Sequence, residues 1–156
     1  MQFDPRWGGP GAVEFSSLVS WPTRTEPGIR HYSGTAVYTK RFDLPAAAKN
    51  TARATRYFVD LGNVRELAEV RVNGKSCGIV WAPPFRVDVT DAAQPTGNTL
   101  EVEVVNFWPN RIIGDAALPL EKRLTKTNVL ELKASTPLVE SGLLGPVRLG
   151  TLVQRE

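Results

Sequence analysis

The chain has 156 residues and a formal net charge of +3 at pH 7, which fits one domain with enough apolar residues for a core. Its Lys and Arg residues are dispersed, so the charge does not indicate a nucleic-acid partner. No run of about 18 apolar residues predicts a membrane span, and the segment Met1–Gly11 lacks the apolar core of a signal peptide.

Proline and glycine recur along the whole chain, and no apolar pattern of helical period extends beyond a few turns, which favours an all-β fold. The hairpin signal is strongest at Asn73-Gly74, which lies between two apolar segments. Short strands at steady spacing predict a jelly-roll β-sandwich with variable loops at one end. The expected strands are Val13–Val19, Gly34–Phe42, Arg56–Leu61, Glu69–Asn73, Cys77–Trp81, Phe85–Val89, Thr99–Val105 and Pro146–Val153.

Two short helical turns are also expected. One is Ala46–Ala54, and the other begins at Thr136-Pro137, where a cap and a first-turn proline precede a terminating Gly142. Regular structure is otherwise sparse between Asn106 and Leu143. The length of that segment predicts an ordered functional loop region.

The start of this loop region, VNFWPNRIIGD, combines an aromatic side chain with several hydrogen-bonding groups. An indole such as that of Trp108 can stack on a pyranose ring, while Asn110, Arg111 and Asp115 can bind its hydroxyl groups. The other interpretation of Trp108 is a core plug, and both stay open. For the remaining tryptophans, Trp7, Trp21 and Trp81, burial in the core is favoured.

A second polar and aromatic group, His31-Tyr32-Ser33, lies directly before the Gly34 strand. It is a second candidate group for binding, and the alternative is a surface turn with Tyr32 packed inward. A single histidine is not a catalyst by itself. With one cysteine, Cys77, it cannot make a structural zinc site, and Cys77 is interpreted as a small core thiol.

Familiar catalytic templates are absent from the sequence. The glycine-rich Gly8–Gly11 precedes a strand-like segment and reads as a turn, and no HExxH, Gly-x-Ser-x-Gly or paired-cysteine motif occurs. A glycosidase needs only two carboxylates about 5 to 10 Å apart, so hydrolysis is not excluded. However, Glu101 and Glu103 alternate with apolar residues on a solvated strand face, and no acid/base pair is evident. The chain is therefore not expected to be an enzyme by itself.

Five segments carry a resemblance to a known family: FDPRWGGP, HYSGTAVYTKRFDLP, FVDLGNVRELAEVRVNGKSCGIVWAPPFRVDVT, NTLEVEVVNFWPNRIIGD and SGLLGPVRL. In this order and spacing they resemble the sugar-binding-like β-sandwich domain of glycoside hydrolases. The resemblance is closest to the C-terminal domain of family 106 α-L-rhamnosidases. It is more distant to the jelly roll of family 2 β-galactosidases.

The resemblance implies a galactose-binding-like jelly roll that is normally non-catalytic. Such domains bind carbohydrate or pack against a catalytic domain and complete its active site. Because the catalytic barrel has no counterpart here, residues 1–156 are expected to be one module of a larger enzyme. The resemblance also makes Trp81 part of a packing motif. Finally, it implies that one end of the sandwich gathers His31, Tyr32, Ser33, Trp108, Asn110, Arg111 and Asp115.

The leading hypothesis is thus a non-catalytic carbohydrate-binding module of a bacterial glycoside hydrolase that acts on plant or algal polysaccharide. The alternative is a structural domain that completes the active site of an adjacent catalytic domain without binding sugar. The resemblance implies a secreted or periplasmic parent protein. No nucleic-acid or membrane partner is expected and no cofactor is predicted, although a structural calcium ion held by loop oxygens is an alternative.

Overall fold

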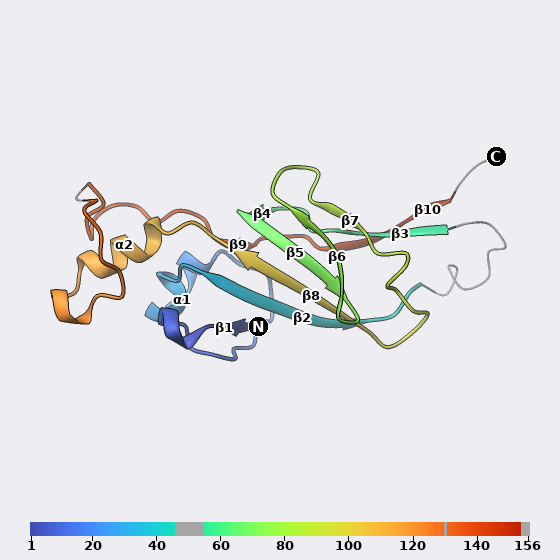
Figure 1. Cartoon of the computed structure of the whole chain (residues 1–156), viewed down its shortest axis with the longest axis horizontal. Helices are drawn as coiled ribbons and strands as arrows, with labels where there is room; N and C mark the ends of the chain where they lie inside the picture. The colour runs from blue at the N-terminus through green and yellow to red at the C-terminus, as the bar shows by residue number, and fades with distance from the viewer. Residues whose placement is uncertain (46–54, 130, 154–156) are drawn as a thin grey trace.

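The computed structural model describes residues 1–45, 55–129 and 131–153. The described part of the chain is built mainly from antiparallel strands, with a few short helices (Figure 1). The strands are β1 (Gln2–Phe3), β2 (Thr35–Phe42), β3 (Thr55–Asp60), β4 (Val64–Arg65), β5 (Leu67–Val72), β6 (Lys75–Val80), β7 (Arg86–Asp88), β8 (Asn98–Val105), β9 (Gly142–Leu143) and β10 (Arg148–Val153). The helices are α1 (Pro27–Arg30) and α2 (Pro109–Ala116), with 3-10 turns η1 (Pro5–Trp7), η2 (Trp21–Thr23) and η4 (Leu120–Lys122).

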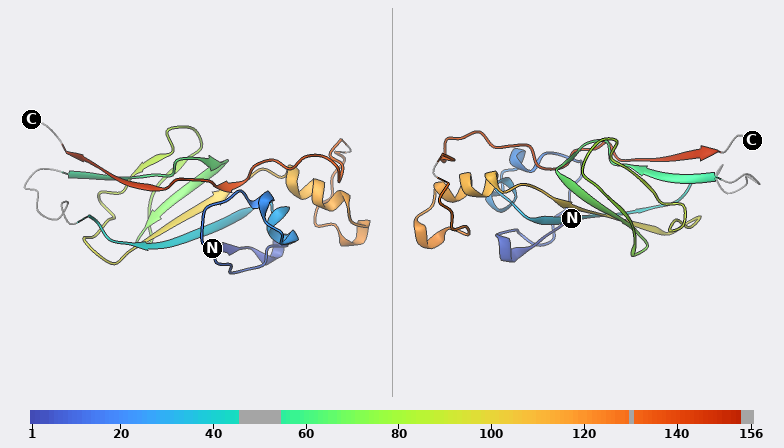
Figure 2. Two further views of the ribbon diagram at one scale, coloured as in Figure 1. Left: turned by 180° about the vertical axis from the view of Figure 1, so that it is seen from behind. Right: turned by 45° about the horizontal axis from the view of Figure 1, so that its top comes forward.

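Two sheets form the sandwich. The larger has the strand order β1-β2-β8-β5-β6 and the smaller has the order β10-β3-β7, while β4 and β9 form a separate short pair. The two main sheets lie as layers one over the other, and α2 extends from one end (Figures 1 and 2). The predicted all-β sandwich is confirmed.

The alternating sequence pattern explains the layered arrangement. In β8, Leu100, Val102 and Val104 are buried, while the glutamates between them are only partly covered. The neighbouring β5 places Val70 directly opposite Val102, and Val72 opposite Leu100. Because successive strand residues point to opposite faces, both strands present one apolar face to the other sheet.

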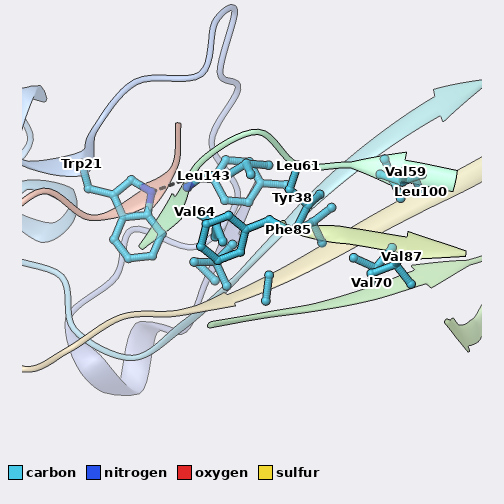
Figure 3. Close-up of a cluster of buried hydrophobic side chains, with 14 of the residues drawn as sticks. Trp21, Tyr38, Val59, Leu61, Val64, Val70, Phe85, Val87, Leu100 and Leu143 are labelled. Atoms are coloured by element: carbon cyan, nitrogen blue, oxygen red, sulfur yellow. Dashed lines mark hydrogen bonds between the residues drawn. The ribbon is translucent and has the colours of Figure 1, made fainter. Parts of the chain in front are cut away.

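Aromatic residues close the core near the α2 end of the sandwich. Trp21 is fully buried, and its Nε1 donates a hydrogen bond of 2.7 Å to the Tyr38 hydroxyl. The backbone N–H of Leu143 donates to the same oxygen at 3.0 Å, so β9 is held to β2 through this group (Figure 3). Gly142, with φ of 97°, passes so close to the indole that a Cβ has no room. The interpretation of Trp21 as a core plug is confirmed.

The Asn73-Gly74 hairpin is also confirmed. Both residues have positive φ, 54° and 78°, as a two-residue type I′ turn requires. The Asn73 side chain adds hydrogen bonds to the Ala92 carbonyl at 2.8 Å and to Asn98 Oδ1 at 2.9 Å. The turn therefore joins β5 to β6 and is also fixed to the loop before β8.

Several expected elements differ from the structure. Val13–Val19 is not a strand: next to it lies only an isolated bridge between Ala12 and Gln2, because β1 is too short to pair further. No helical turn follows Thr136, because its hydroxyl accepts a hydrogen bond of 2.9 Å from the preceding Lys133 N–H and closes a turn instead. Gly142 belongs to β9. The expected helical turn at 46–54 lies outside the described residues.

Two tryptophans are not core residues. Trp81 is 75% exposed and Trp7 is 53% exposed, so the expectation that they are buried is wrong. Trp81 follows β6, which is an edge strand of the larger sheet, and Trp7 ends the short turn η1. Neither position has a second layer over it, whereas Trp21 lies under other aromatic rings.

Candidate functional site

The candidate site is the end of the sandwich that carries α2. The two loops that the sequence singles out meet there: Ser33 Oγ donates to the Phe107 carbonyl at 2.7 Å. Asn106 joins them further, because its Nδ2 donates to the Tyr32 carbonyl at 2.9 Å and its Oδ1 accepts from Gly34 N at 2.9 Å. One buried amide thus fixes the start of α2 to the start of β2.

Tyr32 belongs to the core at this end. Its side chain is fully buried, with the hydroxyl donating to the Thr35 carbonyl at 2.8 Å and accepting from Asp4 N at 3.1 Å. Burial raises the pKa of Tyr32. Its position agrees with the alternative of an inward-packed Tyr32, and its polar group is engaged inside the protein.

Helix α2 begins at Pro109, which supplies the fixed backbone angle favoured at a first helical position. Asn110 lies on the buried side of this helix, and its side-chain amide forms hydrogen bonds with other groups of the protein. Its Nδ2 donates to the Val139 carbonyl at 2.7 Å and to Ser141 Oγ at 3.0 Å, while its Oδ1 accepts from Val139 N at 2.8 Å. This side chain holds the returning segment against the helix.

Arg111 and Asp115 lie one turn apart on the same helix and are both buried. Arg111 Nη2 donates to the Trp7 carbonyl at 3.2 Å, and Nη1 is 3.8 Å from Asp115 Oδ1. Asp115 Oδ2 accepts from the backbone N–H and the hydroxyl of Thr125 at 2.8 and 2.6 Å. Burial lowers the pKa of Arg111, and Asp115 opposes that shift. Within the described residues, Asp115 Oδ1 is the one buried side-chain oxygen or nitrogen that has no hydrogen-bond partner, although it forms an ion pair with Arg111.

His31 packs against α2 from the other loop. A Cβ at Gly114 would lie 2.7 Å from His31 Cβ, so only glycine allows this approach. Burial lowers the pKa of His31, and the charges of Arg30 and Arg111 act in the same direction while Asp115 acts against them. The predicted gathering of His31, Arg111 and Asp115 at one end is therefore observed, although most of the polar groups face inward.

Several large apolar side chains remain exposed at this end, beside exposed charged residues such as Glu121, Lys122 and Arg123. Trp108 precedes α2 and is 56% exposed, which rules out the core-plug alternative for this residue. Trp7, Phe107, Leu120, Leu124 and Val139 are also exposed. We call these six residues the α2-end surface. The sequence did not single out Phe107, Leu120, Leu124 and Val139. The feature that could have indicated them is the number of large apolar residues in a segment otherwise expected to be loop.

The site offers little support for chemistry. No group of three or more His, Cys, Asp or Glu side chains gathers as a metal site within residues 1–45, 55–129 and 131–153. Burial raises the pKa of the Cys77 thiol, which disfavours the reactive thiolate. Among the helices described, none is both long and apolar enough to cross a bilayer.

No family model matches the chain. A protein of Formosa agariphila, provisionally named a beta-glucuronidase, is 37% identical over 166 residues, which cover 92% of this chain and 14% of that protein. The solved structure of a rhamnosidase from Novosphingobium sp. PP1Y aligns with a TM-score of 0.86 and 35% identity, over 97% of this chain and 14% of that one. A beta-glucuronidase from an uncultured Clostridium species aligns with a TM-score of 0.50 and 25% identity, over 66% of this chain and 18% of that one.

These similar proteins are glycoside hydrolases, and the chain spans only 14% of the length of the first two. The chain thus corresponds to a small part of such enzymes, and the agreement with the rhamnosidase extends over nearly all of it. This is consistent with an ancillary domain of a glycoside hydrolase.

Proposed function

We propose that this chain is a non-catalytic ancillary domain of a glycoside hydrolase, and that its α2-end surface packs against the neighbouring catalytic domain. The observation that carries the proposal is the exposure of Trp7, Phe107 and Trp108, at 53, 61 and 56%, at one end of the molecule. Large apolar side chains that gather on a surface are typical of a contact with another protein part. The share of the relatives that the chain covers supports a parent with further domains.

The polar groups at this end favour domain packing over sugar binding as the main role. A sugar site needs hydrogen-bonding groups free to meet hydroxyl groups. Asn110 and Asp115 instead bond to Val139, Ser141 and Thr125, and Arg111 bonds to the Trp7 carbonyl. These side chains therefore hold α2 and its neighbouring segments in the positions that expose the α2-end surface.

A chimera tests the packing role. The segment of the Novosphingobium rhamnosidase that aligns with this chain is replaced by it, and the Phe107→Ser/Trp108→Ser variant of the chimera is compared with Ile79→Ser/Trp81→Ser. All four residues are exposed, so neither pair should unfold the sandwich. We expect the first pair to lower the Tm and the rhamnosidase activity of the chimera, and the second to leave both unchanged. Equal behaviour of the two pairs would reject the α2 end as the packing surface.

Carbohydrate binding centred on Trp108 is the second candidate, because its exposed indole is accessible for stacking. Binding should then be weak, in the millimolar to micromolar range, because a shallow site offsets the costs of ordering and desolvation poorly. Calorimetric titration of the isolated chain with rhamnose-, galactose- and uronate-containing oligosaccharides tests it. Trp108→Ala should weaken binding by about 1 to 3 kcal/mol and leave folding stability almost unchanged. No heat with any of these glycans would remove this candidate.

The same proposal treats residues 1–156 as one domain of a secreted or periplasmic enzyme that acts on plant or algal polysaccharide. It assigns hydrolysis to the neighbouring domain of the parent protein. The isolated chain should therefore release no aryl group from synthetic α-L-rhamnosides, β-galactosides or β-glucuronides at high protein concentration. Measurable turnover that survives repeated purification would contradict the non-catalytic assignment.

A further inference from the structure

The segment that follows α2 is fixed in place beside the α2-end surface. It passes next to the helix (Figure 1), and Thr125 holds it through two hydrogen bonds to Asp115 Oδ2, at 2.8 and 2.6 Å. Leu124 packs on the turn after Trp7, since a Cβ at Gly8 would lie 2.5 Å from Leu124 Cδ1. The side chains around Leu124 and Thr125 therefore have defined positions at the edge of this surface.

Exposed positive charges dominate the same segment. Within residues 118–129 three cations accompany one carboxylate, and all four side chains are exposed: Lys122, Arg123, Lys126 and Glu121. Arg30 adds another exposed cation from the loop before β2. Burial and then the charge of Arg30 lower the pKa of His31, which packs on α2, so Arg30 lies at the same end of the molecule.

These cations differ from the arginines of the sandwich, several of which have counter-ions. Arg71 lies 2.7 Å from Glu69, and Arg86 lies 2.9 Å from Asp60. The four cations at the α2 end form no ion pair within the part of the chain that the structure describes. Arg123 Nε donates to a neutral group, the Leu118 carbonyl, at 2.9 Å. The positive charges at this end are therefore available to a partner.

The packing role proposed above brings these cations to the rim of an interface. Leu120 is 78% exposed and lies two residues before Lys122, while Leu124 is 46% exposed and lies two residues before Lys126. A domain that covers these leucines must also approach the lysines. Positive charges on that domain would oppose docking, whereas carboxylates would favour it.

We propose that the neighbouring catalytic domain meets the α2-end surface with an apolar patch bordered by aspartate or glutamate carboxylates, which pair with Lys122, Arg123 and Lys126. This inference rests on the proposed packing role and specifies the chemistry of the partner. The apolar residues form the centre of the interface and the cations its polar rim. Rim charges contribute mainly to orientation and to the choice of partner.

An acidic glycan would be attracted by the same cations, but the arrangement of side chains favours a protein partner. Leu120 and Leu124 alternate with the cations along the segment and are exposed between them. A hydrated polyanion leaves such leucines in contact with water, whereas a packed domain removes them from it.

Charge reversal in the rhamnosidase chimera tests the proposal. Lys122→Glu/Lys126→Glu is compared with Lys40→Glu/Arg41→Glu, an exposed pair at the opposite end of β2 that gives the same change in net charge. We expect the first pair to shorten the half-life of rhamnosidase activity at raised temperature about threefold or more at about 50 mM NaCl, and much less at about 500 mM, because salt screens rim charges. The control pair should change it little at either concentration. In the isolated chain the first pair should leave the Tm unchanged, because neither lysine has an ion pair to lose.

Four results would overturn the proposal. They are equal effects of the two pairs, an effect that salt does not reduce, a longer half-life of the first variant, and a lower Tm of that variant in the isolated chain. The third would show a basic partner, and the fourth a structural role of the lysines. If only the charge assignment is wrong, Phe107→Ser/Trp108→Ser still destabilises the chimera. If that pair also has no effect, the packing role itself fails.

The glycan alternative has its own measurement, a calorimetric titration of the isolated chain with polygalacturonate. We expect no heat that depends on Lys122 and Lys126. Binding by the parent chain that is lost in Lys122→Glu/Lys126→Glu but retained in Lys40→Glu/Arg41→Glu would assign the cations to an acidic glycan and overturn the proposal.

Discussion

The sandwich and the α2 end are held together by different interactions. In the sandwich, buried strand faces meet across two sheets, and the polar groups of the ladder are satisfied by regular backbone pairing. At the α2 end, individual buried polar side chains form the hydrogen bonds that connect the segments: Asn106 joins two loops, and Asn110 fixes the returning segment. A repeated pattern specifies the first region, while the second depends on a few individual residues.

This difference predicts how each region responds to change. Apolar burial is spread over many side chains, so the core loses stability in proportion to the volume removed. The α2 end depends on hydrogen bonds that leave buried groups unsatisfied when one partner is removed. Its exposed apolar residues should tolerate substitution in the isolated chain, because their contacts are with solvent.

The largest effect is expected at Trp21. Trp21→Ala removes a fully buried indole that packs edge-on against Phe3 and Tyr32 and bonds to Tyr38. We expect a loss of about 3 to 5 kcal/mol in the free energy of unfolding, measured by urea denaturation. The matched control is Trp81→Ala, which should stay within about 0.5 kcal/mol of the parent chain because this tryptophan is 75% exposed. Similar losses for both would contradict the assignment of core and surface.

A smaller effect is expected at Asn110. Asn110→Ala leaves Val139 N and its carbonyl without their partner, so we expect a loss of about 1 to 3 kcal/mol in the free energy of unfolding. Amide exchange at Val139 should become faster than exchange in β8. Asn128→Ala removes an exposed amide from the same part of the chain and serves as the control. Unchanged stability for both variants would show that the returning segment does not depend on this amide.

The smallest effect concerns pH at the α2 end. The pKa of His31 is lowered in the folded state, so the unfolded chain binds the proton first as the pH falls. The stability that neutral His31 contributes is therefore present above its ordinary pKa of about 6.5 and is lost as the pH falls below that value. Because His31 is partly exposed, the loss should be under about 1 kcal/mol between about pH 7.5 and 5.

The measurement for His31 is urea unfolding of the parent chain and of His31→Asn across that pH range. Both proteins carry the same carboxylates, so the difference between their profiles isolates the histidine. The parent should lose more stability than the variant as the pH falls. Parallel profiles would show that the folded environment of His31 does not disfavour its charge.

Sequence reasoning succeeded where a local pattern determines the structure. The alternation in Thr99–Val105 predicted β8, and Asn73-Gly74 predicted the β5–β6 turn, because each depends on neighbouring residues alone. Helix α2 was missed since it is short and has buried Asn110 and Asp115, residues more typical of loops. Whether Trp7 and Trp81 are buried depends on whether another element packs over them, and a local sequence pattern carries no information on such packing.

The candidate site shows the same limit. The resemblance implied that the His31 and Trp108 loops meet at one end. Their contacts through Ser33 and Asn106 agree with this expectation. Which polar groups stay free there depends on partners distant in the sequence, such as Val139 for Asn110. Such pairings leave no periodic signal, so residues chosen as sugar ligands can be structural in the folded chain.

The route of the chain around α2 has a consequence for how such domains diverge. The chain leaves the sandwich after Val105, which accepts a hydrogen bond of 3.0 Å from Glu66 N, and returns at Gly142, which pairs with Arg65. Exit and re-entry therefore touch adjacent residues. A loop with neighbouring ends lengthens at a cost of only about 0.6 kcal/mol for each doubling. Insertions into the exposed part of the intervening segment should therefore cost little loop-closure entropy while the β-frame stays the same.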